Sequence, residues 1–69
     1  MIEDAKTANR LRAGASRVRG AAEALGKRAD DLGGSMMAHL LRLQAGILRD
    51  SAEVLDERAL EADPPKGHA

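Results

Sequence analysis

The segment DDLGGSMM, residues 30–37, decides the fold of this chain, because it places two glycines and a serine between two long helical patterns. Gly33 can adopt the left-handed backbone conformation that ends a helix. Ser35 is a favourable N-cap residue for the helix that follows. A link this short between long helices requires them to fold back on each other as an antiparallel hairpin.

The predicted domain organisation is a single helical-hairpin domain over residues 1–63, followed by a flexible tail over residues 64–69. The prolines of the C-terminal segment DPPKGHA end the second helix. Within the domain we expect a helix over about residues 3–32, a turn over 33–35 and a helix over about 35–62.

Alanines recur every seven residues in both halves of the chain, and a column of larger aliphatic residues runs beside each alanine column. This pattern is typical of the a and d positions of a coiled coil. When the chain folds back at its glycines, opposed alanines have residue numbers that add up to 67. We therefore expect an all-α fold, a long antiparallel helical hairpin with an Ala/Leu coiled-coil seam. The alanines are Ala8, Ala15, Ala22, Ala29, Ala38, Ala45, Ala52 and Ala59, and the larger residues are Leu11, Val18, Leu25, Leu32, Leu41, Leu48 and Leu55.

Charge follows the same register. Residues 6–28 are mainly basic and residues 50–63 are mainly acidic, so antiparallel folding lays one stretch along the other. Exposed ion pairs contribute only ~0.2–1 kcal/mol each, and they therefore set the register more than the stability. The expected pairs are Arg10 with Glu57, Arg17 with Asp50, and Lys6 with Glu61.

Length and composition limit the classes of function. The 69 residues include no cysteine and no aromatic residue, which excludes disulfides, thiolate chemistry and the stacking platforms of single-stranded nucleic acid sites. The formal net charge is zero, so the molecule as a whole has no general attraction to nucleic acid or anionic lipid. A domain this short buries little surface and usually depends on a partner.

The N-terminal sequence MIEDAKTANR carries acids where a secretory signal needs bases. No apolar run approaches the roughly 18 residues of a membrane span. We therefore expect a soluble, cytoplasmic protein that does not bind membranes. Eight arginines against three lysines, with abundant alanine and glycine, indicate a GC-rich bacterial genome.

The segment GAAEALGK, residues 20–27, resembles a phosphate-binding loop but departs from its pattern. That loop needs four residues between its glycines, a Ser or Thr after the lysine, and a strand before it. Here the spacer is one residue longer and Arg28 follows the lysine. The segment is therefore predicted to be part of a helix.

His39 follows Met36 and Met37, and a soft-metal site at these three residues is the weaker interpretation, because thiolates and a second histidine are lacking. We expect a surface histidine and no metal. No nucleophile, base and orienting group recur at a helical spacing. The sequence therefore predicts no enzyme activity, no catalytic residue, no cofactor and no small-molecule substrate.

The second helix carries more apolar surface than a hairpin partner can cover, and soluble monomers tend to avoid such surface. Two explanations stay open: the core of a homodimeric four-helix bundle, or a docking face for a helix of another protein. Either one predicts a protein–protein interaction module, such as an adaptor, chaperone, antitoxin-like inhibitor or assembly factor. The expected interface residues are Met36, Leu40, Leu43, Ile47 and Val54.

Arginines on both flanks of the first helix suggest an alternative function, a small dimeric regulator that binds nucleic acid phosphates. The acidic second helix would neutralise part of that field, and no base-reading residues stand out. A solvated, salt-bridged face is the simpler interpretation. The candidate contacts are Arg10, Arg12, Arg17, Arg19 and Arg28.

Overall fold

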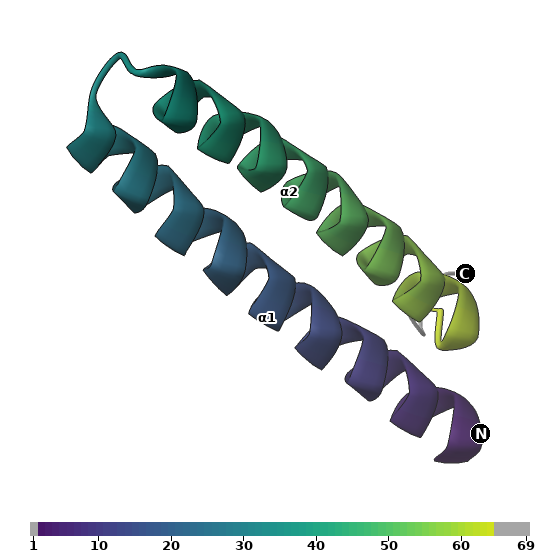
Figure 1. Cartoon of the computed structure of the whole chain (residues 1–69). Helices are drawn as coiled ribbons and strands as arrows, with labels where there is room; N and C mark the ends of the chain where they lie inside the picture. The colour runs from purple at the N-terminus through teal and green to yellow at the C-terminus, as the bar shows by residue number, and fades with distance from the viewer. Residues whose placement is uncertain (1, 65–69) are drawn as a thin grey trace.

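The computed structural model describes residues 2–64, with side chains from residue 5 onward, and these residues form two helices and no strand. Helix α1 runs over Ile2–Leu32 and helix α2 over Met36–Ala62. The helices lie side by side and run in opposite directions, so the start of α1 and the end of α2 share one end of the molecule (Figure 1). This confirms the predicted all-α hairpin. The predicted tail, apart from Pro64, lies outside the described residues.

The turn uses the chemistry that the sequence predicts. Gly33 has a φ of 67°, the left-handed conformation that favours glycine, and its N–H donates to the carbonyl oxygen of Asp30 at 3.2 Å. Ser35 has an extended backbone, and its side-chain oxygen accepts a hydrogen bond from the N–H of Ala38 at 3.1 Å. Both helix ends at the turn are therefore capped as expected.

The core of the described hairpin consists of alanine alone. All eight predicted alanines are buried, with 0% or 1% of their surface exposed, and no larger side chain among the described residues is fully buried. Methyl side chains in successive layers allow two helices to approach near the low end of the usual 8–10 Å spacing. The burial of both columns agrees with the predicted register.

The larger aliphatic columns flank the alanine core and do not lie within it. The columns are half-buried, and Leu32 at the end of α1 remains 44% exposed. Each larger residue follows an alanine by three positions, which places it about 60° round the helix from that alanine. Because the alanines point straight at the partner helix, the larger residues lie to one side of the contact line.

The three predicted ion pairs are absent from the described residues, and this part of the prediction is wrong. The ion pairs that form there are Arg19 with Asp56, and Asp30 with Arg42 at 3.5 Å. Arg19 follows a core alanine by four residues, about 40° from the contact line, as Asp56 does on α2. The predicted partners, such as Arg17 and Asp50, lie at least about 140° from the alanine columns and therefore point away from the opposite helix.

The hairpin is long and flat: its Cα atoms span 50 Å by 21 Å by 13 Å. Over the part of the chain that the structure describes, neither helix is both long enough and apolar enough to cross a membrane.

Candidate interaction surfaces

One face of the hairpin is apolar and receives side chains from both helices. A Cβ built on Gly14 of α1 would lie 3.6 Å from Cδ1 of Leu55 of α2, so these positions adjoin across the seam. Further along, Leu25 of α1 lines a hollow of about 290 Å³ together with Gln44, Ile47 and Leu48 of α2. We call this surface the apolar face, and its members are Leu11, Val18, Leu25, Leu40, Leu41, Ile47, Leu48, Val54 and Leu55.

The structure divides the predicted interface residues into two rows. Ile47 is 65% exposed and lines the hollow, and Leu40 and Val54 lie seven residues to either side of it on the same side of α2. Met36 and Leu43 are also exposed, but they lie about 60° further round α2, away from α1. The first row is therefore continuous with the apolar face, and the second row forms its outer edge.

Sequence reasoning assigned the spare apolar surface to α2 alone and missed the contribution of α1. The half-buried Leu11, Val18 and Leu25 belong to the same face. The spacing of the aliphatic columns from the alanine columns already indicates this contribution of α1. In an antiparallel pair, residues that follow the contact-line residue by three positions on each helix lie on the same flank. Both aliphatic columns have that spacing, so one face collects both.

Ser51 and Gln44 are polar residues that lie within the apolar face, each one position before a core alanine of α2. The hydroxyl of Ser51 donates to the carbonyl oxygen of Ile47 at 3.1 Å, one turn earlier in α2. Ser51 therefore satisfies its donor within its own helix and can be covered without an unpaired hydroxyl. Gln44 lines the hollow beside Ile47.

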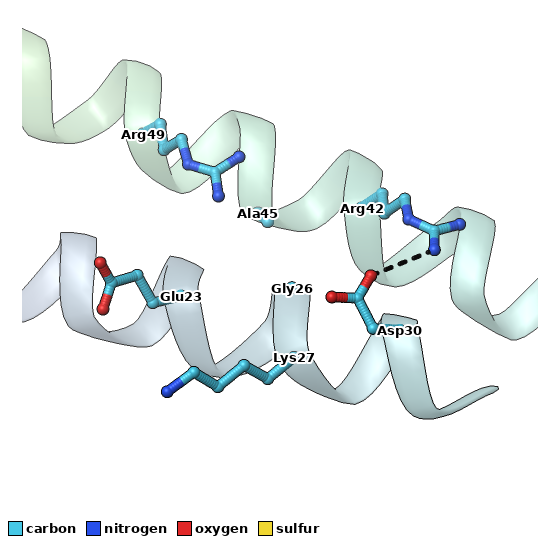
Figure 2. A pocket seen from close by; sticks show the side chains of 7 residues that line it. All are labelled: Glu23, Gly26, Lys27, Asp30, Arg42, Ala45 and Arg49. Carbon is cyan, nitrogen blue, oxygen red and sulfur yellow. Dashed lines mark hydrogen bonds and ion pairs between the residues drawn. The ribbon is translucent and has the colours of Figure 1, made fainter. Parts of the chain in front are cut away.

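The opposite flank of the hairpin is charged. It holds an open groove of about 670 Å³ in which Arg42 and Arg49 of α2 lie across from Glu23 and Asp30 of α1 (Figure 2). Arg42 pairs with Asp30, whereas Lys27 extends away from α2 (Figure 2). A smaller groove of about 230 Å³ continues along this flank. We call this surface the charged flank, and its members are Arg19, Glu23, Asp30, Arg42, Arg49, Glu53 and Asp56.

Residues of both charges occur along the charged flank, and the grooves are open to solvent. Among the described residues, no group of three His, Cys, Asp or Glu side chains could hold a metal ion. His39 is exposed. The residues that line the two grooves include no Ser, Thr, Cys or His.

The five arginines suggested for nucleic acid are all exposed, but the structure does not bring them onto one surface. Arg19 pairs with Asp56 on the charged flank, and Arg12 donates to Oδ1 of Asn9 at 3.2 Å. Arg10 and Arg17 lie about 160° away from Arg12 and Arg19 around α1. The nucleic-acid function therefore stays a prediction from the sequence alone.

Comparison with protein-family models, with curated proteins and with solved structures finds no match to this chain.

Proposed function

We propose that this chain is a non-enzymatic protein–protein interaction module that docks α-helices on its apolar face. The observation that carries the proposal is the row Leu40, Ile47 and Val54, which is about half exposed or more and lies beside half-buried leucines of both helices. Monomeric proteins rarely leave a contiguous apolar surface of this length in water. An adaptor, a chaperone, an antitoxin-like inhibitor or an assembly factor would use such a face.

The free energy of burying apolar side chains supports a function in which a partner covers this face. An alanine core buries few carbon atoms per residue, so the hairpin contact alone offers a small hydrophobic gain. Full burial of a Leu, Ile or Val side chain contributes roughly 1.5–3 kcal/mol. Covering Ile47 and its neighbours is therefore the largest stabilisation available to the described hairpin.

The test compares two glutamate variants of the tagged full chain, isolated from its native host. Ile47→Glu places a charge in the centre of the apolar face. Leu60→Glu is the matched control, because Leu60 is 51% exposed but lies one turn after Asp56, on the charged flank. The measurement is the sedimentation mass of the isolated species, with helix content by circular dichroism.

We expect wild type and Leu60→Glu to sediment as a complex, and Ile47→Glu to lose the complex, with or without its helix content. Wild type that sediments at the mass of a single tagged chain with full helix content would refute the proposal. So would an Ile47→Glu variant that keeps the complex intact.

A further inference from the structure

We propose that the occupant of the apolar face is a second copy of this chain, stacked face to face with both turns at the same end. In this arrangement α1 of one copy lies over α2 of the other. The proposal rests on the proposed docking function and adds the partner and its orientation.

The size of the face fits a dimer. A surface 50 Å long and 21 Å wide has a projected area of about 1,000 Å². A stable protein interface buries about 800 Å² on each partner. A second hairpin has the same length and width, so its apolar face matches this one in size.

The two long edges of the apolar face carry opposite charges. Arg10 and Arg17 lie about 100° round α1 from its aliphatic column, and Asp50 and Glu57 lie about 60° beyond the row of Ile47, on the outer side of α2. Within the described residues, none of these four side chains forms an ion pair. A partner for the face should therefore offer an acidic edge to α1 and a basic edge to α2, and a second copy has both.

Symmetry then selects the orientation. A two-fold axis parallel to the helices keeps every residue at its own height and places α1 over α2 of the second copy. Arg17 and Asp50 are level, because their numbers add up to 67, as those of Ala22 and Ala45 do. Arg17 of each copy therefore lies level with Asp50 of the other at the rim of the interface. The same holds for Arg10 and Glu57.

The alternative two-fold axis runs across the helices and places the two turns at opposite ends. In that arrangement α1 lies over α1 of the second copy, and α2 lies over α2. Arg17 lies near the middle of α1 and Asp50 near the middle of α2. Each would then approach the same residue of the second copy, which juxtaposes like charges. Charge complementarity favours the arrangement with both turns at one end.

The first test exchanges these charges in the purified full chain. Arg17→Glu and Asp50→Arg each turn two attractive contacts per dimer into repulsive ones, and we expect each to weaken dimerisation by roughly tenfold. The double variant restores opposite charges and should recover the affinity. Arg12→Glu is the matched control, because it makes the same change of charge away from the apolar face. Dissociation constants come from sedimentation equilibrium.

The second test measures the orientation directly. Gly34→Cys introduces the only cysteine of the chain, at a position where a Cβ meets nothing within 4 Å. A spin label at this site reports the distance between the two turns by double electron–electron resonance. We expect roughly 10–20 Å, one to two interhelix spacings. A distance near the 50 Å length of the hairpin would overturn the orientation.

The outcomes separate this proposal from the docking function on which it rests. A purified chain that stays monomeric refutes the second copy, whereas loss of the complex in Ile47→Glu from the host would still support docking of another protein. A dimer whose affinity is unchanged in Arg17→Glu and Asp50→Arg keeps self-association but refutes the proposed pairing of edges.

Discussion

Ala22 and Ala45 show how single residues determine this structure. Each is fully buried against the opposite helix, and each contributes only a methyl group. Closely spaced helices gain dispersion contacts between their backbones and methyl groups, and these contacts decrease steeply when the spacing increases by even half an ångström. The fold therefore depends on the absence of larger side chains at these positions.

Ala22→Leu should destabilise the hairpin by roughly 1–3 kcal/mol, because three additional carbon atoms force the helices apart. Ala13→Leu is the matched control: Ala13 is exposed on α1, and leucine is nearly as good a helix former as alanine. Urea unfolding followed by circular dichroism, at one protein concentration, measures both variants. Equal stability of Ala22→Leu and wild type would show that the alanine contact is not tightly packed.

At the scale of the helices, α1 is a weak element on its own. Gly14, Gly20 and Gly26 lie in its interior, and each costs up to about 1 kcal/mol relative to alanine. Gly14 and Gly26 adjoin side chains of α2, at Leu55 and Arg49, with room for a methyl group. Gly20 adjoins nothing. Helix α1 therefore depends on packing against α2 for much of its stability.

Gly20→Ala should stabilise the protein by about 0.5–1 kcal/mol, because a Cβ there meets no atom within 4 Å and the unfolded chain loses conformational freedom. Gly33→Ala should have the opposite sign, since the left-handed conformation at 67° costs an alanine about 1 kcal/mol. Thermal and urea unfolding measure both. A Gly33→Ala variant as stable as wild type would mean that the turn relaxes to another conformation.

The sequence predicts the turn and the helix caps well, but it predicts poorly which charged side chains point toward the opposite helix. Gly33 and Ser35 act through hydrogen bonds and dihedral angles within a few residues, so residue type and spacing suffice. The ion pairs failed because matching heights along two helices does not fix angles around them. Arg17 and Asp50 are level but point away from each other's helix within the hairpin, and that angle shows only when each residue is counted from the alanine contact line.

The molecule as a whole has two unlike long surfaces. The charged flank forms ion pairs between its own residues, such as Arg19 with Asp56, and both side chains of that pair remain partly exposed. Such exposed pairs add little stability. The apolar face holds larger side chains, which the alanine core leaves half-buried or exposed. The alanine core contributes little hydrophobic stabilisation, and burial of the apolar face by a partner would therefore add to it.

This asymmetry predicts a thermal stability that depends on protein concentration. If a second copy covers the apolar face, mass action raises the melting temperature as the concentration increases, because only the folded state associates. We expect a steady rise of the melting temperature of wild type over a hundredfold range of concentration, followed by circular dichroism. Ile47→Glu should melt at a lower temperature that does not change with concentration. Leu60→Glu should follow wild type, since Leu60 lies on the charged flank. A wild-type melting temperature that is constant over this range would show that the hairpin folds without a second copy, and the stability of its alanine core would then need another source.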